Sequence, residues 1–130
     1  MVAQWAKLIP LAVALTSMIA LSACTSSPTP LRIVTSDQPA ASGMEALLSV
    51  QLQVDGDGCV YGDGSDGRVT VVWPLGYTVR GNSTTFDILD ADGEVAASSG
   101  ATLAIGGGVV DATSDTWHEL ECATGTLWLF

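Results

Sequence analysis

The sequence predicts a small all-β domain, either a barrel or a sandwich of about seven to nine short strands. Apolar and polar residues alternate over several short stretches, as they do on half-buried strands. Glycine-containing turns separate these stretches, and no long apolar stripe recurs at helical spacing. The part of the chain from 43 to 130, about 88 residues, is long enough for a single modest core.

The expected strands begin with 48–54, where Leu48, Val50 and Leu52 alternate with Ser49 and Gln51. Residues 69–73 are β-branched and apolar, which is typical of a buried strand. The remaining strands are shorter and are expected at 86–88, 94–97, 103–105, 118–122 and 126–130.

Three turns are expected between these strands. Asp92-Gly93 is a hairpin signal between 86–88 and 94–97. Pro74 suits the second position of a type I turn and Gly76 its fourth, between Trp73 and Tyr77. The run 106–108 consists of glycine alone and predicts a tight turn at which two backbones approach closely.

The first 23 residues have the three parts of a secretory signal peptide. Lys7 lies in a short basic region, residues 8–21 are uncharged and mostly apolar, and Ser22 and Ala23 are small. This uncharged run of 14 residues is shorter than the roughly 18 apolar residues that a membrane-spanning helix needs. Residues 1–23 are therefore expected to direct export and to be removed.

The end of this segment, Leu21-Ser22-Ala23-Cys24, resembles the bacterial lipobox. The resemblance implies a lipid on the Cys24 sulfur and cleavage before Cys24. The alternative is an ordinary cleaved signal peptide in which Cys24 is incidental. Two or more acyl chains hold a protein firmly on a membrane, so we expect an extracytoplasmic protein anchored to the cell membrane.

Residues 24–42 are rich in Ser, Thr, Pro and Ala and are expected to form a tether. Its prolines, Pro28, Pro30 and Pro39, disfavour a helix. The apolar island 31–34 allows a second interpretation, in which this part of the tether docks on the domain.

Three cysteines are an odd number for an exported protein, and lipidation of Cys24 leaves Cys59 and Cys122. Because export leads to an oxidising compartment, this pair predicts one disulfide bond. The alternative is a pair of buried free thiols.

After loss of Lys7, three arginines face 14 acidic residues, which gives a side-chain net charge of −11. A surface of that sign repels phosphates, so nucleic acid is excluded as a partner.

Two acidic turns, 55–58 and 62–67, suggest a calcium-responsive module as one function. Neither turn matches a calcium-loop pattern: an EF-hand loop starting at Asp55 or at Asp63 meets Val60 or Arg68 where glycine is required. Since Asp-Gly pairs are also ordinary turn formers, we expect no metal and no other cofactor.

A small envelope hydrolase is the other alternative function. It would use His118, Glu119 or Glu121, with both glutamates on one face of the expected strand 118–122 and His118 on the other with Leu120 and Cys122. A partly buried His118 and a solvated glutamate edge are the simpler interpretations.

Large aromatic residues offer a further surface for a ligand. Trp73, Tyr77 and Trp117, together with Glu119 and Glu121, are the candidates for it. In so small a domain, large aromatic residues are more often part of the core.

Several segments together resemble a family of small secreted and lipoprotein β domains, chiefly from high-GC Gram-positive bacteria. The matching segments are Gly58-Cys59, the acidic turn 63–67, Trp73 to Tyr77, Asp90 to Gly93, the glycines 106–108, Cys122 and Trp128. The resemblance implies a shared fold and the cysteine pair, and it implies no activity. Because the candidate catalytic and metal-binding residues all have simpler interpretations, we expect a non-enzymatic module that binds or scaffolds an envelope component.

Overall fold

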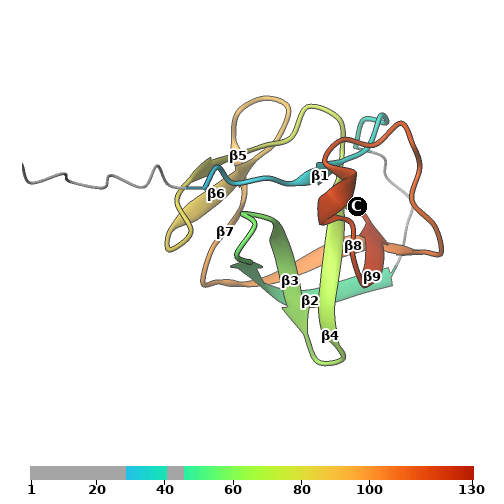
Figure 1. Cartoon of the computed structure of the whole chain (residues 1–130), viewed down its shortest axis with the longest axis horizontal. Helices are drawn as coiled ribbons and strands as arrows, with labels where there is room; N and C mark the ends of the chain where they lie inside the picture. The colour runs from blue at the N-terminus through green and yellow to red at the C-terminus, as the bar shows by residue number, and fades with distance from the viewer. Residues whose placement is uncertain (1–28, 41–45) are drawn as a thin grey trace, which may run out of the picture.

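The computed structural model describes residues 29–40 and 46–130. The expected signal peptide 1–23 and Cys24 lie outside these ranges. Nine strands in the described ranges form two sheets, which confirms the predicted all-β fold (Figure 1). Within 29–40 and 46–130, no helix is long and apolar enough to cross a membrane.

The larger sheet closes into a small barrel. β3 (Val60–Gly64) and β4 (Gly67–Trp73) form a hairpin, and β2 (Ala46–Val54) pairs antiparallel with β3 and with β8 (Thr102–Val110). β9 (Thr126–Leu129) pairs with β8 and, in parallel, with β4. This second pairing of β9 closes the ring of strands, so that β2, β3, β4, β8 and β9 surround one core.

β1 (Val34–Thr35) adds a parallel strand to the second half of β4, in the register Val34↔Val72. Ile33 and Val34 are buried, with 6% and 0% of their surfaces exposed. The backbone of Arg32 also bridges to Cys59, at the start of β3. The structure therefore confirms the second interpretation of the tether, in which the island 31–34 docks on the domain.

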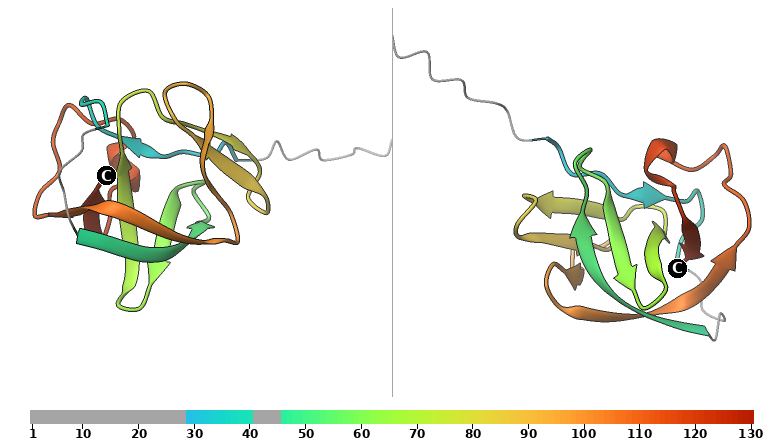
Figure 2. Two further views of the ribbon diagram at one scale, coloured as in Figure 1. Left: turned by 180° about the vertical axis from the view of Figure 1, so that it is seen from behind. Right: turned by 60° about the horizontal axis from the view of Figure 1, so that its bottom comes forward.

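The smaller sheet packs against the barrel. It contains β5 (Thr78–Gly81), β6 (Phe86–Leu89) and β7 (Val95–Ser98), in that order (Figures 1 and 2). The predicted Asp92-Gly93 hairpin joins β6 to β7, and Gly93 has a φ of 82°. Phe86, Ile88 and Ala97 share one apolar cluster with residues from β2 and β4.

The strand predicted for 118–122 is wrong. Residues Leu120–Cys122 form one turn of 3-10 helix, and His118 makes only an isolated bridge to Thr35. Glu119, just before the turn, has a left-handed backbone with φ 58°. The disulfide bond of Cys122 and the docking of β1 hold this segment, and both are contacts that alternation along the chain does not encode.

The structure also contains strands that were not predicted. The acidic segment 62–64 belongs to β3, and only Ser65 and Asp66 form the turn to β4. Position 62 of β3 is a glycine because Val50 packs against it: a Cβ on Gly62 would lie 2.9 Å from a methyl group of Val50. β5 was missed as well, since its four residues Thr78–Gly81 carry little apolar alternation.

The turn after Trp73 lies one residue later than predicted. The Tyr77 amide donates to the Pro74 carbonyl over 3.2 Å, which makes Leu75 and Gly76 the central residues. Gly76 has a φ of 88°, which is the requirement of the third position of a type II turn. The type I prediction is therefore wrong. Gly76 occupies the third position of a type II turn, where the backbone needs a positive φ that glycine adopts without strain.

The glycines 106–108 do not form the predicted tight turn but lie within β8. At this point β8 leaves β2, with Gly107 opposite Ala46, and takes up β9, with Gly108 opposite Leu129. The predicted close approach is nevertheless present. Gly107 has a φ of 146°, and a Cβ there would lie 2.1 Å from the carbonyl oxygen of Leu129.

We therefore expect Gly107→Ala to destabilise the barrel by at least ~2 kcal/mol, because overpacking and a disfavoured backbone conformation act together. Urea unfolding followed by tryptophan fluorescence measures this loss. Gly56→Ala is the matched control, since a Cβ on Gly56 would meet no atom within 4 Å. Equal stability of the two variants would contradict the role assigned to Gly107.

Candidate functional site

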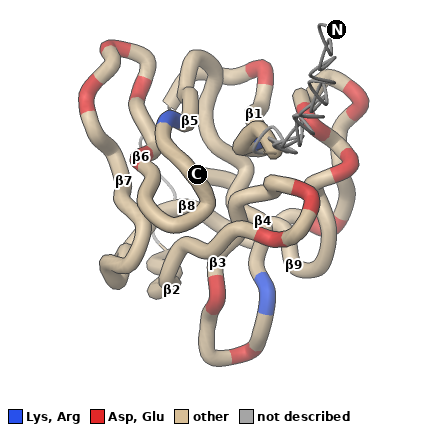
Figure 3. Tube along the Cα trace, turned by 60° about the vertical axis from the view of Figure 1, so that its left-hand side comes forward, with Lys and Arg blue, Asp and Glu red and all other residues tan. Residues whose placement is uncertain are grey.

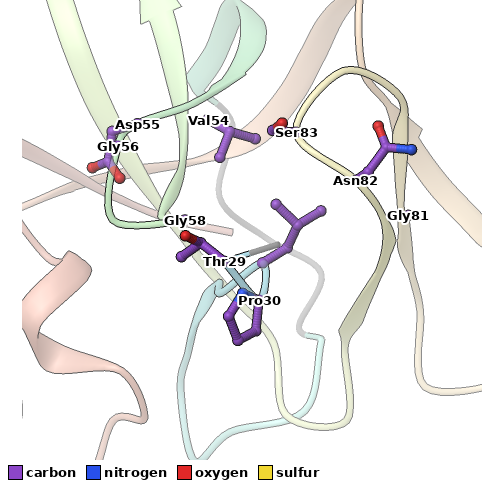
Figure 4. A pocket seen from close by; sticks show the side chains of 10 residues that line it. Thr29, Pro30, Val54, Asp55, Gly56, Gly58, Gly81, Asn82 and Ser83 are labelled. Carbon is purple, nitrogen blue, oxygen red and sulfur yellow. The ribbon is translucent and has the colours of Figure 1, made fainter. Parts of the chain in front are cut away.

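An open pocket lies between the segment that precedes β1 and two turns, and its volume is about 380 Å³ (Figure 4). Asn82 and Ser83 lie on one side of it, and Asp55 and Gly56 lie on the other. The remaining wall is formed by Thr29, Pro30, Leu31, Val54, Gly58 and Gly81. The volume is within the range of small-ligand sites, at its lower end.

The 55–58 turn is fixed by the carboxylate of Asp55. Its Oδ1 accepts hydrogen bonds from the amides of Asp57 (2.9 Å) and Cys59 (3.0 Å). Its Oδ2 pairs with Arg68 at 3.0 Å. Burial by itself raises the pKa of Asp55, but these hydrogen bonds and the guanidinium outweigh it and lower the pKa below its usual value. Asp55 thus holds the pocket wall and is already engaged on both oxygens.

A pH dependence follows for Asp55→Asn. Because the pKa of Asp55 is lowered by folding, its charged form stabilises the protein above the unfolded pKa of about 3.9. That contribution is lost as the pH falls through the lower, folded pKa. We expect wild type to melt at a higher temperature than Asp55→Asn near neutral pH, and the difference to shrink below about pH 4.

Melting curves over this pH range test the expectation. Asp66→Asn, in the β3–β4 turn, is the control because it removes the same charge away from the pocket. A wild-type advantage over Asp55→Asn that stays constant down to the most acidic sample would contradict the linkage.

The opposite wall is the turn between β5 and β6. The side-chain oxygen of Asn82 accepts hydrogen bonds from the amides of Thr84 and Thr85, both at 2.9 Å. This bonding fixes the turn. Thr29 and Ser83 contribute hydroxyl groups to the lining and Asn82 contributes an amide, and none of the described residues that line the pocket is basic.

A second cluster surrounds Arg32 and the disulfide bond. Cys59 and Cys122 are joined, with their Cα atoms 5.4 Å apart, and both are buried. This confirms the predicted disulfide. Arg32 lies over it, with one guanidinium nitrogen 3.6 Å from the Cys59 sulfur and 3.0 Å from the Asp57 carbonyl oxygen. Arg32 thus ties β1 to the beginning of β3.

The two candidate glutamates both bind Arg32. Glu119 lies 3.2 Å from the guanidinium, and Glu121 forms a closer ion pair with the same nitrogen. A hydrogen bond from its own backbone amide lowers the pKa of Glu121, aided by Glu119 and Arg32. Both side chains are engaged structurally on the surface, and neither lines the pocket.

The remaining candidates do not join a common surface. Trp73 is 1% exposed and stacks in the core on Tyr77, with ring centroids 5.9 Å apart. Burial raises the pKa of Tyr77, as does the nearby charge of Asp90. Trp117 packs against the buried cluster around the disulfide. His118 is exposed, so the interpretation of a partly buried imidazole is wrong. Its backbone amide donates a hydrogen bond to the Thr35 carbonyl.

The two acidic turns lie at opposite ends of β3. Asp55 precedes the strand, and Asp66 follows it in the hairpin to β4. Within the described ranges, no three His, Cys, Asp or Glu side chains are grouped so that they could hold a metal ion. The four carboxylates that suggested calcium therefore do not converge.

All three arginines of the described ranges pair with carboxylates: Arg32 with Glu119 and Glu121, Arg68 with Asp55, and Arg80 with Asp87. Arg68 also lies over the ring of Tyr61, 4.2 Å from its centroid. Acidic residues are distributed over the loops of the molecule (Figure 3). The three arginine charges are thus neutralised by carboxylates of the same chain, and the remaining acidic residues leave the surface anionic.

Sequence reasoning missed the pocket residues Asn82 and Ser83, and it missed the role of Arg32. Asn82-Ser83 is an ordinary turn pair, so no local signal marks it. Arg32 carried a weak signal, because a rare arginine in an acidic domain is expected to find carboxylates. The sequence does not show which carboxylates these are.

Comparison with known proteins identifies no relative: no protein-family model, curated protein or solved structure matches the chain.

Proposed function

We propose that this chain is a lipid-anchored, extracytoplasmic module of the cell envelope that binds an uncharged, hydroxyl-bearing ligand and catalyses no reaction. The export signal and the Leu-Ser-Ala-Cys24 site support the location. The pocket supports the binding role. The observation that carries the proposal is its lining, in which Asn82, Ser83 and Thr29 provide polar groups and no basic side chain is present.

The chemistry of the wall favours an uncharged ligand. Among the described residues that line the pocket, Asp55 is the only carboxylate, and both its oxygens are engaged. An anionic ligand would approach a protein whose arginines are already paired and whose loops are acidic. Hydroxyl groups of a ligand can exchange hydrogen bonds with the hydroxyl groups of Ser83 and Thr29.

The same arrangement gives the hydrolase alternative little support. Acid–base hydrolysis of a glycan uses two carboxyl groups that flank the scissile bond. Glu119 and Glu121 instead share Arg32 on the surface, and Asp55 lacks a second carboxylate in the pocket.

A sedimentation experiment tests the proposal. The chain from Thr25, which holds every described residue, is incubated with an insoluble preparation of cell envelopes. We expect it to sediment with the envelopes and to release no soluble fragments. Ser83→Trp, which fills the pocket mouth, is expected to remove binding. Ser65→Trp, in the β3–β4 turn, is the matched control and is expected to keep it.

Two outcomes would contradict the proposal. Binding that Ser83→Trp leaves intact would place the ligand elsewhere. Release of soluble sugar or peptide fragments that stops in the double variant Glu119→Gln, Glu121→Gln would favour the hydrolase.

A further inference from the structure

The chain that leads to Cys24 enters the barrel beside the pocket. Thr29 and Pro30 line the pocket, and the Arg32 amide donates to the Gly58 carbonyl at 2.8 Å. The Val60 amide donates in turn to the Arg32 carbonyl at 2.9 Å. Contact here is close enough that a Cβ on Gly58 would lie 2.3 Å from the Pro30 carbonyl oxygen. Residues 29–32 are therefore fixed to the start of β3.

Docking of this segment shortens the tether. Cys24 lies five residues before Thr29. At about 3.6 Å per residue, the two are separated by at most about 18 Å. A domain of this size is roughly 30 Å across. The connection is thus shorter than the domain that it holds, and it cannot bring all faces of the barrel equally close to a membrane.

We infer that the tether holds the pocket end of the barrel against the bilayer in which Cys24 is anchored, and that the pocket binds the uncharged, hydroxyl-bearing headgroup of a lipid in that bilayer. This inference rests on the proposed anchor and on the proposed binding role of the pocket. It adds the source of the ligand and the orientation in which the protein meets it.

The groups around the pocket suit such a headgroup. The volume of about 380 Å³ accommodates one small polar group rather than a polymer chain. Leu31, Val54 and Pro30 line the same pocket as Ser83 and provide apolar contacts there. Asp57 belongs to the 55–58 turn that contributes to the pocket wall, and its exposed negative charge disfavours an anionic phosphate.

The opposite end of the barrel provides the comparison point. The Ser65-Asp66 turn lies beyond the far end of β3, about 20 Å from Gly58 by the rise of an extended strand. Figure 2 shows β1 entering beside the start of β3, away from the β3–β4 hairpin. With the pocket toward the lipid, this hairpin faces away from the membrane.

Fluorescence quenching in vesicles tests the orientation. The full, lipidated chain is placed in phosphatidylcholine vesicles with a fluorophore at Gly56→Cys, on the pocket rim, or at Ser65→Cys. Gly56 suits labelling because a Cβ there meets no atom within 4 Å. We expect a nitroxide on the lipid headgroups to quench the Gly56 probe several-fold more than the Ser65 probe. Equal quenching in protein that floats with the vesicles overturns the orientation.

A variant with a longer tether tests whether the short tether causes this orientation. Insertion of a Gly-Ser segment between Ser26 and Ser27 is expected to leave flotation unchanged and to remove the difference between the two probes. A difference that survives the insertion overturns the role of the tether. Failure of the native chain to float would instead contradict the anchor, so the two proposals are tested separately.

The headgroup is tested with the same labelled chain. Adding galactosyl diacylglycerol to the vesicles is expected to shift the emission of the Gly56 probe, whereas phosphatidylglycerol is not. Ser83→Trp is expected to abolish the shift, and Ser65→Trp to preserve it. No shift with the glycolipid, in protein that still binds envelopes through the pocket, overturns the lipid source of the ligand.

Discussion

Replacing Cys24 by Ala is expected to release the protein from membranes or to leave the precursor uncleaved. In the proposed anchor the Cys24 thiol forms the thioether that the Leu21-Ser22-Ala23-Cys24 site implies, and alanine provides no nucleophile. Without acyl chains the anchor is lost, because each buried methylene contributes about 0.8 kcal/mol to membrane binding. Cell fractionation followed by mass analysis of the mature N-terminus measures both effects.

Ser26→Ala is the control, since it changes a neighbouring small residue and keeps the thiol. It is expected to fractionate as wild type does. A Cys24→Ala protein that remains with the membranes at the processed size would show that something other than a lipid on Cys24 holds it there.

The second large effect is expected from the double variant Cys59→Ala, Cys122→Ala. The disulfide closes a loop between residues 63 apart, and a loop of that length restrains the unfolded chain by about 4 kcal/mol. Small domains have only about 5–15 kcal/mol of stability in total. We expect the double variant to unfold at a much lower urea concentration than oxidised wild type, and reduction of wild type to produce a similar loss.

Thiol alkylation of the folded, oxidised protein is the accompanying measurement. Intact mass is expected to show no alkylated Cys59 or Cys122. Two alkylated thiols, or a double variant within about 1 kcal/mol of wild type, would mean that the bond does not have the role assigned to it.

The fold class was predictable because its signals are local. Leu48, Val50 and Leu52 alternate with polar neighbours, and Asp92-Gly93 joins two strands with a preferred turn pair. Errors occurred where a tertiary contact overrides the local pattern. Glu119 to Cys122 alternates like a strand, but the segment forms a 3-10 turn whose last residue, Cys122, is bonded to Cys59.

The candidate site was less predictable than the fold. Trp73 has the residue type of a ligand platform, but it lies in the core with Tyr77 and Phe130. The two sides of the pocket come from the turns at 55–58 and 81–83. Strands β3, β4 and β5 lie between these turns along the chain, so no local pattern links them. Since turn residues such as Asn82 are chosen for backbone reasons in most proteins, their type alone does not indicate a ligand.

By itself the sequence determined the all-β class, and from cysteine parity and the export signal it predicted the Cys59–Cys122 bond, because alternation, turn chemistry and parity are properties of the chain. Only the tertiary structure decided that β1 belongs to the barrel through Val34↔Val72, and that Glu119 and Glu121 bind an arginine 87 and 89 residues away. Such contacts depend on which distant segments pack together to bury apolar surface, and a local pattern does not specify the partner.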